Sequence, residues 1–125
     1  MLDDWIDMNL STLKEKIWAC YTKELCYPKN RERWSPENPS YGMCAITALI
    51  VNDYFDGEIA KIYVDNDSHY FNLIDNQIID LTSEQFGHEI DYTECKVVKR
   101  QDILTDDTRK RYDVLRNELE KHLTL

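Results

Sequence analysis

The chain carries a cysteine, a histidine and an aspartate whose types and spacing fit the three parts of a thiol enzyme. Cys44 stands where an irregular segment gives way to a long apolar run, in NPSYGMCAITALIVNDYF. His69 lies in SHYFNLI, and Asp80 follows it eleven positions later in IIDLT. Such a set can attack an amide or acyl group, with Cys44 as nucleophile, His69 as general base and acid, and Asp80 as the group that orients the imidazole.

The position of Cys44 is the first argument for this chemistry. A cysteine attacks as a thiolate, so a catalytic cysteine needs a local field that favours the anion. The start of a helix supplies one, because its backbone N–H groups and macrodipole attract negative charge. Cys44 follows Gly42 at the predicted start of a helix, and its own N–H could donate to an oxyanion. The remaining cysteines, Cys20, Cys26 and Cys95, lack this placement, so we predict that Cys44 is the most reactive thiol.

A predicted β-hairpin supplies the second argument. Asp75 and Asn76 suit a two-residue turn with positive φ, and with this turn Phe71 pairs with Asp80. Residues two apart on a strand share a face, so His69 and Asp80 become diagonal neighbours with Cβ atoms about 6–8 Å apart. An imidazole and a carboxylate can bridge that distance. The spacing therefore predicts a His69–Asp80 pair.

Each of these residues also has a plainer interpretation. Free cysteine is among the most buried residue types, and a cysteine at a helix start is commonly only packed there. A histidine that opens a strand is more often a surface or capping residue. Asp80 is harder to explain in this way, because a carboxylate among apolar neighbours needs a partner. The rival to an enzyme is a non-catalytic binding or regulatory module on the same fold, and a third possibility is a redox-sensing thiol.

The N-terminal part of the chain predicts one helix and one irregular connection. Ser11 or Thr12 can cap the helix, with Thr12 and Glu15 as a capping box, and apolar residues then recur on one face to about Cys26. Residues 27–42 contain all three prolines of the chain and form a connection with bends.

The rest of the chain predicts a sheet between two further helices. Cys44–Phe55 is apolar on almost all sides, which indicates a helix packed on more than one face, and Asp56-Gly57 ends it. A helical turn is expected over residues 82–87 and a closing amphipathic helix over Asp106–Leu123. Four strands are expected, at Ile59–Val64, His69–Ile74, Gln77–Leu81 and Glu94–Val98. The buried side of the closing helix should consist of Tyr112, Leu115, Leu119 and Leu123. This order of elements indicates a single α+β domain over residues 1–125.

Composition excludes several classes of function. The formal charge of −9 argues against a nucleic-acid-binding surface. We expect the basic residues of the closing helix, which lie among acidic ones, to form a solvated face: Arg109, Lys110, Arg111 and Arg116. The acidic N-terminus does not resemble a signal peptide, and no run is long enough to cross a bilayer, so a cytoplasmic protein with reduced thiols is expected. The spacing of the cysteines fits no zinc site, and no cofactor motif occurs.

The motifs resemble those of two protein groups. GMCAITAL and SHYFNLI…IIDLT resemble the core of the papain-like and transglutaminase-like thiol enzymes, which implies a papain-like fold with Cys44, His69 and Asp80 as a catalytic triad. Hydrolysis, deamidation and acyl transfer on a peptide, protein or small amide all remain open. From about Trp34 onward, the chain also resembles the small uncharacterised bacterial YunG-like family. Members of that family usually have Gln directly before the cysteine, where this chain has Met43.

Other residues are weaker candidates for function. His88 lies in an acidic stretch, and His122 lies in the last turn of the closing helix, where a cation suits the helix dipole. We interpret both as structural or surface residues. Trp34 and Tyr41 flank the expected site and either line a substrate groove or anchor the proline-rich segment, and anchoring is the favoured interpretation.

Overall fold

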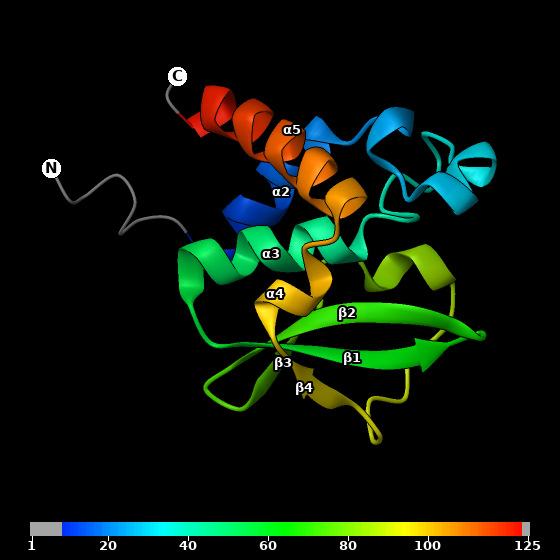
Figure 1. Ribbon diagram of the computed structural model, residues 1–125, viewed down its shortest axis with the longest axis vertical. Helices are drawn as coiled ribbons and strands as arrows, with labels where there is room; N and C mark the ends of the chain where they lie inside the picture. Colours follow the sequence, from blue (N-terminus) through cyan, green and yellow to red (C-terminus); the bar gives the residue numbers. More distant parts are fainter. Residues whose placement is uncertain (1–8, 124–125) are drawn as a thin grey trace, which may run out of the picture.

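The apolar segment at the centre of the sequence folds into helix α3, Cys44–Phe55, which lies between a sheet and the helices α2 and α5 (Figure 1). The structure is a computed structural model, and it describes residues 9–123. Because α3 packs against other elements on both sides, almost all of its side chains must be apolar, as they are in this sequence. The helices are α2 (Leu10–Cys20), α3, α4 (Arg100–Ile103) and α5 (Asp106–Leu123), and the 3-10 turns are η1 (Lys23–Leu25), η2 (Pro28–Arg33) and η3 (Ser83–Phe86).

The strands form one four-stranded antiparallel sheet in the order β3-β2-β1-β4. Their bounds are β1 (Glu58–Val64), β2 (Asp67–Ile74), β3 (Gln77–Ile79) and β4 (Lys96–Val98). The predicted turn is confirmed, with φ of 52° at Asp75 and 64° at Asn76, and Leu73 pairs with Ile78 as expected. The α+β class is therefore confirmed.

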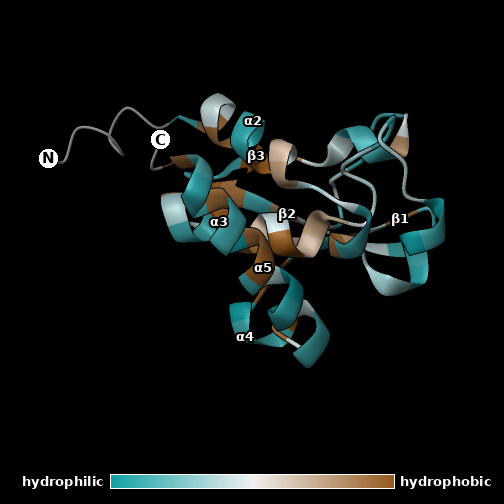
Figure 2. Ribbon diagram, turned by 90° about the horizontal axis from the view of Figure 1, so that it is seen from above, coloured by the Kyte–Doolittle hydropathy of each residue, from teal (hydrophilic) through white to brown (hydrophobic). Residues whose placement is uncertain are grey.

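The sheet is covered on both faces. On the α3 face, the buried side chain of Asn72 donates to the carbonyl of Ala48 at 3.0 Å and so ties β2 to the helix. The opposite face carries a second cluster of buried apolar residues, formed by Ala60, Ile62, Val64 and Phe71. Figure 2 shows the hydrophobic residues toward the middle of the molecule and the hydrophilic ones along its outer parts.

The first helix is shorter than predicted and starts earlier. Its N-cap is Asn9, whose side chain accepts from the Thr12 N–H at 2.8 Å, so a capping box of Thr12 and Glu15 is wrong. The helix ends at Cys20, because Tyr21 turns to an extended conformation and places its hydroxyl 2.5 Å from that of the buried Thr47. A contact with a residue far along the chain thus ends a helix that local spacing would continue.

Two strands are also shorter than predicted. The third ends at Ile79, because the Leu81 carbonyl accepts from the Trp18 indole at 2.9 Å and the Asp80 carboxylate accepts from the N–H of Thr82, two residues further on. The fourth covers only Lys96–Val98, and the short helix α4 that follows it was not predicted.

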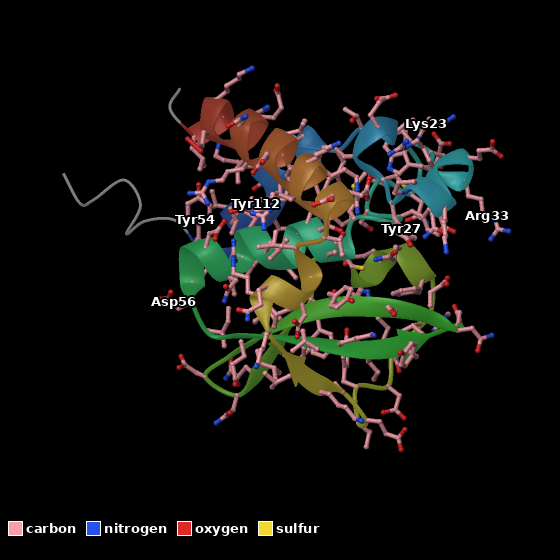
Figure 3. All side chains as sticks on the ribbon, viewed as in Figure 1. Lys23, Tyr27, Arg33, Tyr54, Asp56 and Tyr112 are labelled. Atoms are coloured by element: carbon pink, nitrogen blue, oxygen red, sulfur yellow. The ribbon has the colours of Figure 1, made fainter. Side chains whose placement is uncertain are left out.

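The closing helix α5 matches its predicted bounds, but its basic residues do not all face water. Arg111 is 6% exposed; it donates to Asp107 at 2.9 Å and to the Leu25 carbonyl at 3.0 Å. Arg116 pairs at 2.8 Å with Asp53 of α3. Asp53 also accepts from the hydroxyl of Tyr112, a residue of α5 that is labelled in Figure 3. The prediction of a solvated basic face is therefore wrong for Arg111, since folding gives this cation partners on other elements.

Candidate functional site

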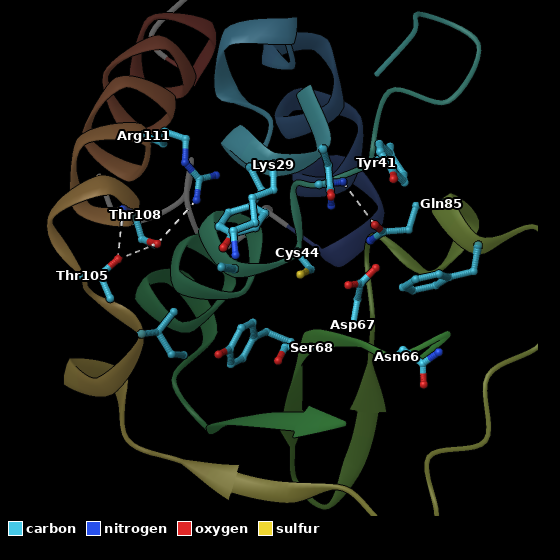
Figure 4. A pocket seen from close by; sticks show the side chains of 17 residues that line it. Lys29, Tyr41, Cys44, Asn66, Asp67, Ser68, Gln85, Thr105, Thr108 and Arg111 are labelled. Atoms are coloured by element: carbon cyan, nitrogen blue, oxygen red, sulfur yellow. Dashed lines mark hydrogen bonds between the residues drawn. The ribbon is translucent and has the colours of Figure 1, made fainter. Parts of the chain in front are cut away.

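Cys44 is the first residue of α3, and the backbone before it leaves the end of the helix open. The N-cap residue Met43 makes no side-chain capping bond, and the first N–H bonded back along the helix is that of Thr47, to the Met43 carbonyl at 3.1 Å. The N–H groups of the first turn therefore remain available to an anion. Cys44 is half-buried and lines a cavity of about 420 Å³ (Figure 4).

Gly42 fixes the chain that leads into this helix. Its φ is +74°, and a Cβ on it would come within 2.4 Å of the Cys26 sulfur and 3.1 Å of the Tyr27 nitrogen. Its carbonyl accepts from the Tyr27 N–H at 3.0 Å, and its N–H donates to the Gln85 side chain at 3.2 Å. The start of α3 is thus held by two segments that are distant in the sequence.

We expect Gly42→Ala to lower the free energy of unfolding by about 2–4 kcal/mol, because the variant adds a steric clash to the strain of a left-handed backbone. Gly87→Ala is the matched control, since Gly87 has φ of +69° but a Cβ added to it would meet no atom within 4 Å. This control should cost only about 1–2 kcal/mol. Chemical denaturation of both variants measures the difference, and equal losses would show that the approach to Cys26 is unimportant.

His69 and Asp80 form the pair that the hairpin register predicts. The Nε2 of His69 lies 2.6 Å from an Asp80 oxygen, and the exposed fractions of the two side chains are 0% and 4%. β3 stops at Ile79, so Asp80 leaves the ladder directly after the strand. β3 pairs only with residues 72–74 of β2, so the part of β2 that carries His69 has no neighbouring strand on the β3 side. This gap gives the Asp80 side chain room to reach the imidazole ring.

The other ring nitrogen of His69, Nδ1, is buried as well. Among the described residues, the buried Nδ1 makes no hydrogen bond of ordinary geometry. The Cys44 side chain is nevertheless close enough to influence the ring. Burial lowers the pKa of His69, but the interactions with Asp80 and Cys44 outweigh burial and raise this pKa to about 9. The favoured state of the His69 ring at neutral pH is thus the imidazolium, with the Asp80 carboxylate on one side and Cys44 nearby.

Asp80 is held by two further residues. The oxygen that contacts His69 also accepts from the Tyr92 hydroxyl at 2.7 Å, and the other oxygen accepts from the Thr82 N–H at 3.2 Å. Burial, followed by Asp80, raises the pKa of Tyr92, so its hydroxyl remains a donor. Sequence reasoning missed Tyr92, because it lies in an irregular segment where neither periodicity nor spacing relates it to Asp80.

Aromatic rings shield the histidine from water. The Phe86 ring meets the His69 ring edge-on at 4.9 Å between centroids, and Phe71 stacks on it at 6.2 Å. The cavity is lined by Cys44 and Phe86 but not by His69. A molecule in the cavity therefore reaches the sulfur first, with the imidazole behind it.

The remaining candidates divide between the cavity and the surroundings. Tyr41 lines the cavity, whereas the Trp34 indole donates to the Pro39 carbonyl at 2.9 Å and anchors the loop. His88 is exposed and lies 2.9 Å from Asp65, while Met43 is fully buried in the core.

Across residues 9–123, no three His, Cys, Asp or Glu side chains gather as a metal site would need. No helix in the same range combines the length and apolar character needed to span a bilayer.

Comparison with known proteins identifies one family. The model of the family described as "YunG protein" matches residues 9–124. A relative from Bacillus subtilis (strain 168), described as "Uncharacterized protein YunG", is 36% identical over 91 residues, which cover 73% of this chain and 78% of the relative. No solved structure matches the chain.

Proposed function

The chain belongs to the YunG family, and we propose that it is a thiol enzyme that acts on amide or acyl groups through Cys44, His69 and Asp80. The observation that carries the proposal is the fully buried His69 ring, with Nε2 2.6 Å from Asp80, Nδ1 without a hydrogen bond of ordinary geometry among residues 9–123, and Cys44 close enough to raise the pKa of the ring. Buried polar atoms rarely lack a partner without a functional reason. The arrangement of a cysteine at a helix start, a histidine on a strand and an aspartate after a hairpin resembles that of papain-like enzymes.

In the proposed reaction, the Cys44 thiolate attacks the substrate carbonyl carbon, and the C=O electrons move onto oxygen. The N–H groups at the start of α3 stabilise this oxyanion. The His69 imidazolium gives its proton to the leaving amine as the C–N bond breaks, and a thioester remains. Water or a second amine, deprotonated by His69, then attacks the thioester and releases Cys44. Asp80 holds the ring and stabilises its charge throughout.

A specific observation favours the rival, a non-catalytic binding module. The Met43 side chain is buried in the core, and the nearby Gln85 amide is occupied at both ends, by the Gly42 N–H and by the Thr82 carbonyl at 3.0 Å. The Met43 side chain has no N–H or O–H to donate to an oxyanion, and one of the two N–H groups of the Gln85 amide is already bonded to Thr82. In the enzyme proposal, this stabilisation comes from the backbone of the helix start instead.

We expect Cys44 to be alkylated first among the four cysteines at pH 7. Burial raises the pKa of Cys20 and of Cys26, which makes both poorer nucleophiles. The measurement is the rate of iodoacetamide labelling at each cysteine from pH 5 to 10, read by peptide mass spectrometry. Faster labelling of Cys20, Cys26 or Cys95 at pH 7 would refute the assignment of the nucleophile and favour the binding module.

A further inference from the structure

The wall of the Cys44 cavity contains two exposed charges of opposite sign. Lys29 comes from η2 and Asp67 from the first residue of β2, and both line the cavity together with Cys44 (Figure 4). Within residues 9–123, neither forms an ion pair. These two charges are therefore available to a bound molecule.

The third charged residue of the lining differs from these two. Arg111 is buried, and its guanidinium already bonds to Asp107 and to the Leu25 carbonyl. The charge of Arg111 is thus already neutralised by Asp107, a neighbour on the same helix α5. The ion-pairing capacity of the lining rests with Lys29 and Asp67.

The remaining lining is neutral and mixes aromatic with polar side chains. It includes Tyr41, Tyr70, Asn30 and Asn66. Two opposite charges on the walls of such a hollow create a field across it, which the low-dielectric walls concentrate. The volume of about 420 Å³ is that of a pocket for a small ligand rather than a groove for a long chain.

We propose that the substrate of Cys44 is a small zwitterionic amide, an amino-acid derivative or short peptide with both a free carboxylate and a free amine. The carboxylate faces Lys29, the ammonium group faces Asp67, and the amide between them lies at the sulfur. This inference rests on the proposed function, since it names the substrate class of the same site. A neutral peptide segment within a long chain would gain nothing from either charge.

The first test uses pairs of thiol reagents at pH 8.5. Lys29→Gln should lower the ratio of the Cys44 rates for anionic iodoacetate and neutral iodoacetamide about three- to tenfold, because it removes one positive charge near the sulfur. Asp67→Asn should lower by a similar factor the ratio for (2-aminoethyl) methanethiosulfonate and neutral methyl methanethiosulfonate. Any change in the ionisation of the thiol affects both reagents of a pair and cancels in the ratio.

Two variants serve as matched controls for charge. Lys23→Gln removes a lysine on the outer side of η1 (Figure 3), and Asp75→Asn removes an exposed aspartate at the β2–β3 turn. Neither residue lines the cavity. Both controls should leave the ratios within twofold of those of the unmodified protein. Ratios that stay equally unchanged in the Lys29 and Asp67 variants would overturn the inference.

The second test measures protection of Cys44 from iodoacetamide. Millimolar alanylglutamine, which is zwitterionic, should slow labelling at least threefold more than its uncharged N-acetyl, C-amide form, and the Lys29 and Asp67 variants should lose this difference. Equal protection by the two forms, or protection by neither, would overturn the substrate class. If the zwitterion protects but Cys44 is not the most reactive thiol, the binding site stands and the proposed enzyme fails.

Discussion

His69→Asn should slow alkylation of Cys44 at pH 7 at least tenfold while leaving the folded protein intact. In the proposed mechanism, the imidazolium stabilises the Cys44 thiolate, so its removal should leave less of the reactive thiolate for the reagent. By pH 10, a cysteine ionises without assistance, so the rates of variant and unmodified protein should converge. Labelling rates across this pH range measure the effect, and circular dichroism checks the fold.

His88→Asn is the matched control for this variant. His88 also has a raised pKa through its hydrogen bond to Asp65, but it is exposed and does not line the Cys44 cavity. The control should label like the unmodified protein. If His69→Asn also labels normally at pH 7, the ring takes no part in activating the thiol.

The His69→Asn variant also tests the ionisation of His69, through the pH dependence of the free energy of unfolding. Its pKa in the folded protein is about 9, above the ordinary 6.5, so the charged ring stabilises the fold. This contribution is fully present below pH 6.5 and is lost as the pH rises through 9. The unmodified protein should therefore lose up to about 3 kcal/mol relative to His69→Asn between these limits.

Asp80→Asn should slow alkylation of Cys44 at pH 7 about tenfold and lower the free energy of unfolding by about 1–3 kcal/mol. The amide keeps the volume of the carboxylate, and its single oxygen can still accept from the Thr82 N–H, while its NH2 group replaces the oxygen that accepts from Tyr92. It removes the negative charge that stabilises the His69 imidazolium beside a thiolate. Labelling kinetics and denaturation on this single variant separate the effect on chemistry from the effect on folding.

Asp91→Asn is a close control, because Asp91 likewise accepts from a backbone N–H two residues ahead, that of Thr93 at 2.9 Å, but is not bonded to a histidine. Asp91→Asn should change neither the rate of Cys44 labelling nor the free energy of unfolding to a large extent. A less stable Asp80→Asn protein with unchanged labelling at Cys44 would show that Asp80 only supports the turn to Thr82. The triad hypothesis would then be wrong.

The geometry of the candidate pair could be predicted because it depends on local rules. Asp75 and Asn76 both tolerate positive φ, a two-residue turn sets the register, and the period of a strand then puts His69 and Asp80 within reach. The apolar run from Cys44 to Phe55 similarly predicted a helix with neighbours on more than one side. These features need only the residues next to one another in the chain.

Contacts between distant segments decided the rest. Tyr92 reaches Asp80, Tyr21 ends α2 by meeting Thr47, and Arg111 is buried against Leu25, each across 12 or more positions of the chain. Neither periodicity nor turn propensity encodes such pairs.

The sequence by itself therefore determined the class of the fold, the start of α3 at Cys44 and the hairpin that joins His69 to Asp80. The tertiary structure alone decided that a cavity opens at the sulfur, that the imidazole lies buried near it, and that Lys29 and Asp67 line its walls without an ion partner among residues 9–123. The physical reason is that burial and ion pairing depend on which distant surfaces meet, whereas helices and hairpins follow from neighbouring residues.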